Sequence, residues 1–203
     1  MSGSGYETLS SETVFQGRVL TVKVDEVAMP DGTAKREYVG HPGAVAVVAL
    51  DAAGAVVMVE QYRYPVRRRL LELPAGLLDV AGEPAVRAAE RELFEEARVH
   101  AARWDVLVDL YTTPGMTDEA VRVYLARELS DATETYDATG EEVELTISRV
   151  PLADATAAVM AGEICNSIAV AGILAADRAQ RNGFDGLRPA GAPWSAKPDL
   201  AGR

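Results

Sequence analysis

A continuous apolar run, AVAVVAL at residues 44–50, places the strongest constraint on what this chain can fold into. A strand with apolar side chains on both faces must be covered on both sides, so the run predicts a fully buried strand. A turn at 51–54 and the apolar-rich segment AVVMVEQYRY at 55–64 predict a second strand directly after it. A covered sheet is therefore expected around these residues.

Helical and strand-like patterns are mixed along the rest of the chain. The expected helices span residues 84–98, 152–162 and 167–181, and further strands are expected at 104–110, 121–125 and 142–150. Strands flanked by helices in mixed order predict an α/β or α+β sandwich. The basic cluster at 67–69 is interpreted as a solvated loop.

The chain is expected to divide into three parts. An N-terminal β unit, 1–42, has strand-like segments at 19–29 and 35–39 around a Pro-Asp-Gly turn, which predicts a hairpin. The main domain is expected at 43–182. Residues 183–203 are rich in Gly, Pro and Ala and are interpreted as a loosely held tail.

Composition narrows the possible partners and locations. The 203 residues carry a net charge of -11 and lack the basic footprint of a nucleic-acid-binding protein. Because no run of 18 apolar residues exists and the first residues are polar, neither a membrane span nor a secretory signal is expected. The single cysteine, Cys165, fits a reducing compartment, so a cytoplasmic location and a buried, inert thiol are expected.

The predicted helix at 84–98 has an acidic edge beside its apolar stripe. At 100° per residue, Leu93 and its apolar neighbours form a core-facing stripe, and Glu92 and Glu96 lie one turn apart along its border. Glu95 lies three residues after Glu92. Such a run is either a solvated acidic face or a cation site, because Mg²⁺ prefers carboxylate oxygens and this spacing lets two of them share an ion.

The flanks of this helix favour the cation site. Residues 76–99 resemble the Nudix box, G-x5-E-x7-R-E-U-x-E-E-x-G-U, with Gly76, Glu83, Arg91 and the glutamates in matching places. The chain departs from the box twice. Six residues separate Gly76 from Glu83, and Arg98 replaces the late glycine. If that position needs a positive φ, Arg98 carries strain of about 1 kcal/mol.

Further segments are similar to the ADP-ribose pyrophosphatase branch of the Nudix family. These are LELPAG before the box, the N-terminal β unit, and Pro114, which lies fifteen residues after Val99 (114 − 99 = 15). The resemblance implies an α/β/α sandwich with a mixed sheet and a site for Mg²⁺, with Mn²⁺ as a substitute. The implied metal ligands are Glu92, Glu95, Glu96 and the Ala75 carbonyl, with Arg91 and Glu83 as braces.

The resemblance also implies hydrolysis of ADP-ribose to AMP and ribose 5-phosphate by a homodimer. A glutamate after the box acts on the attacking water in this branch. Here that is Glu142, with Glu141 as the alternative. Arg63 and then Arg36 are expected to hold the diphosphate, because the planar guanidinium pairs with phosphate oxygens. Glu72 is either a ligand of the adenosine side or a strand-edge charge.

Two other functions stay open at this point. The box serves the metal and the diphosphate, so another nucleoside diphosphate derivative, such as a nucleotide sugar or dinucleoside polyphosphate, is an alternative substrate. A catalytically silent Nudix module that senses a nucleotide is the second alternative, favoured by Arg98 and the inserted loop residue. His41 and His100 lie outside the box and are expected to be structural or surface residues.

Overall fold

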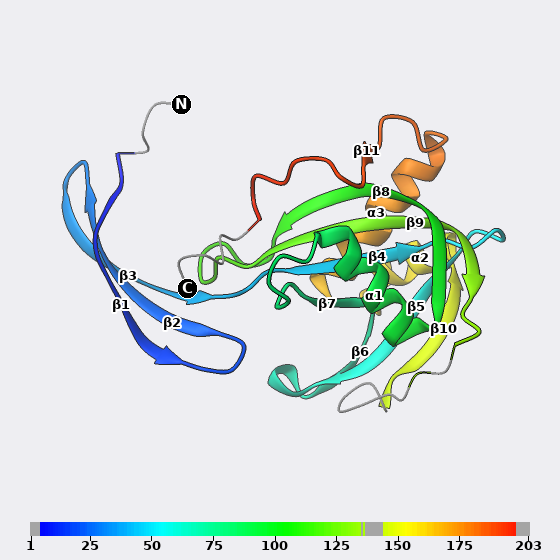
Figure 1. The fold of residues 1–203 in the computed structure, drawn as a ribbon, viewed down its shortest axis with the longest axis horizontal. Coiled ribbons are helices and arrows are strands. Elements are labelled where there is room, and N and C mark those ends of the chain that lie inside the picture. Colours follow the sequence, from blue (N-terminus) through cyan, green and yellow to red (C-terminus); the bar gives the residue numbers. More distant parts are fainter. Residues whose placement is uncertain (1–4, 135, 137–143, 198–203) are drawn as a thin grey trace.

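The computed structural model describes residues 5–134, 136 and 144–197, which form three sheets with three α-helices (Figure 1). Strand orders are β1-β2-β3, β10-β5-β6 and β11-β8-β9-β4-β7. The strands are β1 Glu7–Gln16, β2 Thr21–Met29, β3 Gly32–Gly40, β4 Ala44–Ala49, β5 Ala55–Arg63, β6 Arg68–Glu72, β7 Ala75–Leu77, β8 Val99–Tyr111, β9 Ala120–Asp131, β10 Thr146–Pro151 and β11 Arg188–Pro189. The helices are α1 Ala85–Ala97, α2 Leu152–Ala161 and α3 Ser167–Arg181, with a short 3-10 turn, η1 Tyr64–Val66.

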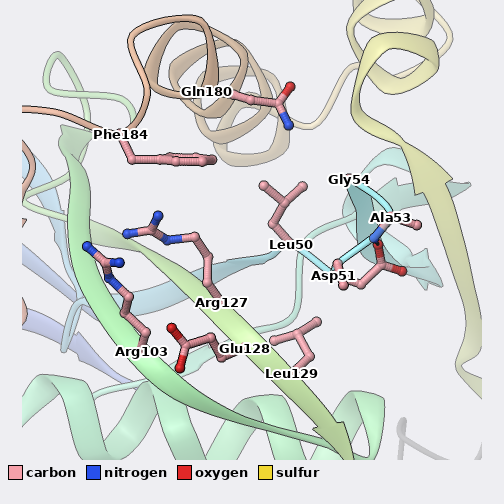
Figure 2. A pocket seen from close by; sticks show the side chains of 11 residues that line it. Leu50, Asp51, Ala53, Gly54, Arg103, Arg127, Glu128, Leu129, Gln180 and Phe184 are labelled. Atoms are coloured by element: carbon pink, nitrogen blue, oxygen red, sulfur yellow. Dashed lines mark hydrogen bonds between the residues drawn. The ribbon is translucent and has the colours of Figure 1, made fainter.

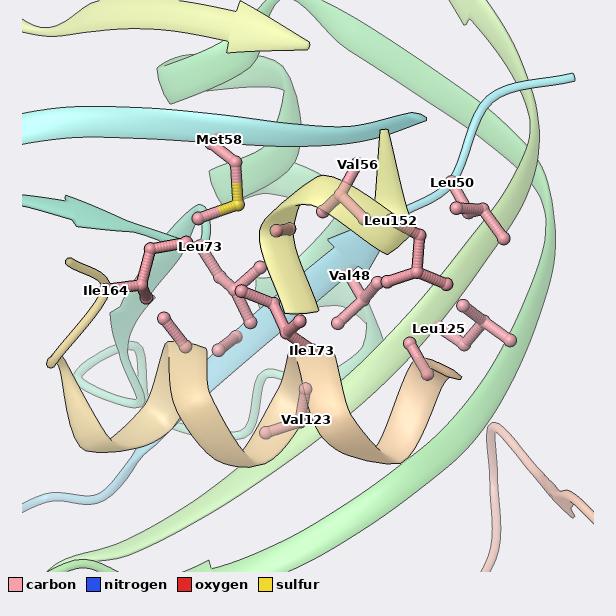
Figure 3. Packing of buried hydrophobic residues seen from close by; sticks show 14 of the residues in the cluster. Val48, Leu50, Val56, Met58, Leu73, Val123, Leu125, Leu152, Ile164 and Ile173 are labelled. Atoms are coloured by element: carbon pink, nitrogen blue, oxygen red, sulfur yellow. The ribbon is translucent and has the colours of Figure 1, made fainter. Parts of the chain in front are cut away.

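Strand β4 is fully buried, as its apolar run predicted. It pairs parallel to β9 and antiparallel to β7, so the expected mixed sheet is confirmed. Alternate side chains enter two different cores, because successive residues of a strand point to opposite faces. Val45 and Val47 join the α1 side, whereas Ala46 and Val48 pack with α2 and α3 (Figure 3). The α/β/α sandwich is therefore confirmed.

The first β unit contains the expected hairpin, formed by β2 and β3, and a third strand that the sequence did not predict. Strand β1 pairs antiparallel with β2, and all ten of its residues are exposed. A strand with no buried face has no alternation of apolar and polar residues, which is why the sequence did not predict it. The sheet stands away from the sandwich (Figure 1).

The cluster at 67–69 is not a solvated loop. Arg68 and Arg69 begin β6 and pair with Arg63 and Tyr62 of β5. Strand β6 is the edge of its sheet, where long charged side chains can reach water. Arg67 alone lies in the turn, and its guanidinium carbon lies 3.5 Å from the centre of the Tyr64 ring.

The C-terminal segment is held against the main domain up to Trp194, so the expectation of a loosely held tail is wrong for that part. Strand β11 pairs antiparallel with β8, and the buried Arg122 side chain donates hydrogen bonds to the carbonyl oxygens of Ala192 and Pro193. A tail without apolar periodicity gave no sign of these long-range partners. Cys165 is exposed, so its predicted burial is wrong as well. No helix within the described residues is long and apolar enough to span a membrane.

Candidate active site

Helix α1 presents its acidic edge to the backbone of β7. Ala88, Ala89 and Leu93 are fully buried beneath the helix and hold it on the sheet. A Cβ atom added to Gly76 would lie 2.0 Å from Cδ of Glu92, so any other residue here would force the Glu92 carboxylate to move. The box glycine is thus needed because a glutamate side chain passes over its Cα atom.

Arg91 is the brace among the box carboxylates that the sequence predicted. Its guanidinium donates to Glu83 at 3.2 Å, to Glu92 at 2.5 Å and to Glu95 at 3.1 Å. The hydrogen bond to Glu83 is the largest of the interactions that raise the pKa of Arg91. One cation therefore offsets the repulsion that three nearby carboxylates would otherwise exert on one another.

Glu92 and Glu96 are held differently. Burial raises the pKa of Glu92 above its ordinary value, although Arg91 opposes that rise. Glu96 accepts a 2.9 Å hydrogen bond from the backbone N–H of Ala75. That bond joins the helix to β7 at the residue whose carbonyl was expected to bind metal.

The donor set of this region fits a hard divalent cation. It offers carboxylate oxygens from two half-buried glutamates one turn apart, next to a glycine whose missing side chain lets the Glu92 carboxylate lie against the backbone. Among the described residues, no group of three or more acidic, histidine or cysteine side chains is arranged around one point. Glu92 and Glu95 both accept hydrogen bonds from Nη1 of Arg91, whereas Glu96 accepts one from the backbone N–H of Ala75.

A cleft of about 830 Å³ opens beside this acidic edge. Five of the predicted residues line it, namely Arg63, Glu72, Ala75, Gly76 and Glu96. The fold therefore brings the box glycine and two of the predicted metal ligands, Ala75 and Glu96, to the same cleft as the predicted diphosphate arginine.

Arg63 and Glu72 form an ion pair inside the cleft. Nη2 of Arg63 lies 2.7 Å from Oε2 of Glu72, and its Nε donates at 3.1 Å to Oε1. The Glu72 side chain is only 3% exposed, whereas that of Arg63 is 40% exposed. Gln61 adds a weaker bond to Glu72 at 3.4 Å. Glu72 is thus no free strand-edge charge, and it fixes the guanidinium at the wall of the cleft.

Other predicted residues are not brought to this cleft. The Arg36 side chain lies on the exposed β3 strand and donates to the Lys35 carbonyl and the Met29 sulfur. Arg36 does not line the cleft in the single chain. Glu141 and Glu142 lie outside the described residues.

Sequence reasoning missed several polar residues at the cleft, among them an ion-pair partner for His41. His41 and Glu119 both line it, with Nδ1 of His41 3.4 Å from Oε1 of Glu119. The backbone N–H of His41 also donates to Asp118 at 2.8 Å. His41 was expected to be a structural or surface residue, and its position at the cleft was not predicted. Its position depends on a loop 77 residues further along the chain, which no local pattern reveals.

A second hollow of about 500 Å³ lies elsewhere in the molecule (Figure 2). It is lined by the turn between β4 and β5 together with Arg103, Arg127 and Phe184. The hollow shares no lining residue with the cleft and includes none of the box carboxylates. Both arginines face the same carboxylate, that of Asp105, at 3.7 Å and 2.6 Å, so part of their charge is already offset.

An acid-edged helix on a mixed sheet, beside an arginine-lined cleft, is the arrangement expected of a hydrolase acting on phosphate esters or anhydrides. The model of the NUDIX domain matches residues 40–164, and that of the nucleoside diphosphate sugar hydrolase N-terminal domain matches residues 6–39. The chain belongs to the Nudix family of hydrolases, which confirms the resemblance seen at 76–99. Members of this family generally need a divalent metal ion.

Three known proteins show how far the likeness extends. The chain is 49% identical over 199 residues to an ADP-ribose pyrophosphatase of Mycobacterium tuberculosis, which covers 98% of this chain and 95% of that protein. It is 40% identical to an ADP-ribose pyrophosphatase of Bacillus subtilis, over 78% of this chain and 85% of that one. A crystal structure of an ADP compounds hydrolase shares the fold, with a TM-score of 0.73 at 22% identity, covering 88% and 95% of the two chains.

Proposed function

We propose that this Nudix hydrolase cleaves the diphosphate of ADP-ribose to give AMP and ribose 5-phosphate, with Mg²⁺ as its metal and Mn²⁺ as a substitute. The observation that carries the proposal is the cleft in which the Arg63–Glu72 pair meets Ala75, Gly76 and Glu96. The chain is 49% identical to an ADP-ribose pyrophosphatase over nearly the full length of both proteins, which supports this choice of substrate.

The metal would be held by Glu92, Glu96, Glu95 and the Ala75 carbonyl. Bound there, it would neutralise phosphate charge and lower the pKa of an attacking water. Arg91 braces Glu92 and Glu95, so these two carboxylates are kept close together before any cation arrives. The half-buried setting of Glu92 strengthens its attraction for a cation, because little water competes for its oxygens.

The substrate would be held mainly by Arg63. Its guanidinium lines the cleft, where Glu72 holds it through Nε and Nη2, and a planar guanidinium is suited to pairing with phosphate oxygens. Arg36 remains the second proposed substrate residue, reaching a site only across a dimer. Glu142 is the proposed base that takes the proton from the attacking water, with Glu141 as the alternative.

We also propose a cytoplasmic homodimer with no nucleic-acid partner, divided into an N-terminal β unit at 1–42, the hydrolase domain at 43–182 and a tail at 183–203. The separate sheet of β1, β2 and β3 supports the first boundary. Its exposed apolar side chains support the dimer, because a thin sheet alone cannot bury them.

The main alternative substrate is a nucleoside diphosphate sugar. The description of the family model that matches residues 6–39 favours this alternative. A panel of ADP-ribose, nucleotide sugars and dinucleoside polyphosphates, scored by phosphate release after a coupled phosphatase, separates the two. We expect the highest kcat/KM with ADP-ribose. Faster cleavage of a nucleotide sugar would replace ADP-ribose as the substrate.

The metal assignment is tested by Glu92→Gln and Glu96→Gln. Each variant keeps the side-chain shape but removes a carboxylate charge, so we expect Mg²⁺-dependent turnover to fall by about 100-fold or more. Glu90→Gln is the matched control, because Glu90 lies on the same helix and pairs only with Arg87 among the described residues. Circular dichroism shows whether the variants stay folded. Full activity in both would remove the assignment.

A further inference from the structure

A group of side chains at the C-terminal end of α1 has no role in the function proposed above. Phe94 and Arg98 come from the end of the helix, His100 from the start of β8, and Tyr136 from the connection after β9. The rings of Phe94 and His100 are stacked at 5.2 Å, and Tyr136 meets Phe94 edge-on at 5.8 Å. These four residues are here called the aromatic clamp.

The aromatic clamp holds the first part of the β9–β10 connection. The carbonyl of Arg98 accepts a 2.9 Å hydrogen bond from the N–H of Ala132. Nε2 of His100 lies 3.3 Å from Oε2 of Glu134. The guanidinium carbon of Arg98 lies 4.1 Å from the centre of the Tyr136 ring. Every second residue from Ala132 to Tyr136 thus contacts the end of α1 or the start of β8.

Arg98 makes these contacts from an unfavourable backbone conformation. It caps α1 with φ 56° and ψ 38°, so the box position does need a positive φ, and glycine would adopt it without strain. What an arginine adds here is its side chain, which donates to the Phe94 carbonyl at 3.3 Å and covers Tyr136. The departure from the Nudix box therefore supplies contacts that glycine cannot make.

We propose that Arg98 is a positioning residue, which fixes the start of the β9–β10 connection against the helix that carries Glu92 and Glu96. The proposal rests on the proposed function, because the candidate bases Glu141 and Glu142 follow Tyr136 by five and six residues. The far end of the connection is also held. Arg69 donates at 3.1 Å to the Glu144 carbonyl, and the next residue, Leu145, lines the cleft.

Two variants test the proposal, Arg98→Gly and Tyr136→Leu. Each variant loses the cation–π contact, so we expect amide hydrogen exchange at 132–136 to become about fivefold faster. We also expect kcat for ADP-ribose to fall about fivefold, with a smaller change in KM. The melting temperature of Arg98→Gly should stay equal or rise, since glycine suits the cap. Tyr136→Phe keeps an aromatic ring and should stay near wild type, as should Thr133→Ala.

The possible outcomes distinguish a failure of the aromatic clamp from a failure of the proposed function. Unchanged exchange at 132–136 in both variants would overturn the aromatic clamp. Faster exchange with wild-type kcat would overturn the positioning role. A loss of kcat that follows a loss of thermal stability would also overturn it, because a merely structural residue behaves in that way. If the wild type does not cleave ADP-ribose, the proposed function fails, whereas the exchange result still decides whether the clamp exists.

Discussion

Gly76 shows how one residue without a side chain governs the geometry of the acidic edge. The Glu92 carboxylate occupies the space that any Cβ at position 76 would fill. Arg91 also holds that carboxylate, through a 2.5 Å ion pair. The neighbouring carboxylates repel one another, so they stay close only where a cation such as Arg91 and tight packing hold them.

Gly76→Ala is therefore expected to abolish most activity without unfolding the protein. The new methyl group would displace Glu92 by an ångström or more, and a misplacement of that size costs about 100-fold in rate. Steady-state kinetics with Mg²⁺ measure the loss. Gly191→Ala is the control, since a Cβ there meets no atom within 4 Å. Activity close to wild type in Gly76→Ala would show that the Glu92 position is unimportant.

Strand β9 secures both the sheet and the C-terminal segment. Arg122 on this strand is buried, pairs with Asp109 of β8 at 2.7 Å, and donates to two carbonyls of the segment at 192–193. Burial alone would raise the pKa of Asp109, but the hydrogen bonds from Arg122 and Arg188 outweigh it and hold that pKa below the ordinary value of 3.8. The segment is thus held through charge as well as through β11.

Asp109→Asn tests this element through the pH dependence of stability. A carboxyl whose pKa is lowered on folding stabilises the protein above its unfolded pKa and loses that effect as pH falls through the folded one. We expect the variant to be less stable by about 1–3 kcal/mol at pH 7, with the gap closing below about pH 4. Urea unfolding at pH 7 and at a pH below about 4 measures the difference in the free energy of unfolding between the variant and the wild type. An equal gap at both would show that charge plays no part.

The whole molecule combines an α/β/α sandwich with a separate three-stranded sheet. Buried apolar cores stabilise the sandwich, whereas the sheet of β1, β2 and β3 has no such core. Strand β1 exposes apolar side chains, among them Leu9 and Phe15, each more than half exposed. A two-layer core needs a second layer, and the single chain provides none over these residues. A second copy is the partner that the proposed homodimer supplies.

Leu9→Lys combined with Phe15→Lys is expected to convert the dimer into monomers, because each lysine would bring a charge into the proposed apolar interface. Sedimentation should show the wild type at twice the chain mass of 21.6 kDa and the double variant at that mass. Thr8→Lys combined with Ser11→Lys adds the same charge at exposed polar positions of β1 and controls for charge alone. A monomeric wild type would contradict the dimer.

The sequence by itself determined the elements with strong local patterns. The buried β4, helix α1 with its acidic edge, and helices α2 and α3 follow from apolar periodicity, and the Nudix box follows from residue spacing. Local patterns suffice there because the apolar face of an element is written within a few consecutive residues.

Only the tertiary structure decided which distant residues meet. The pairing of His41 with Glu119, the docking of residues 192–193 on Arg122 and the exposed strand β1 left no local pattern. Arg98 belongs to the same group. The box raised the question of a positive φ at this position, but the contact of Arg98 with Tyr136 joins residues 38 positions apart (136 − 98 = 38). Such contacts are set by how sheets and helices pack, so no short stretch of sequence contains them.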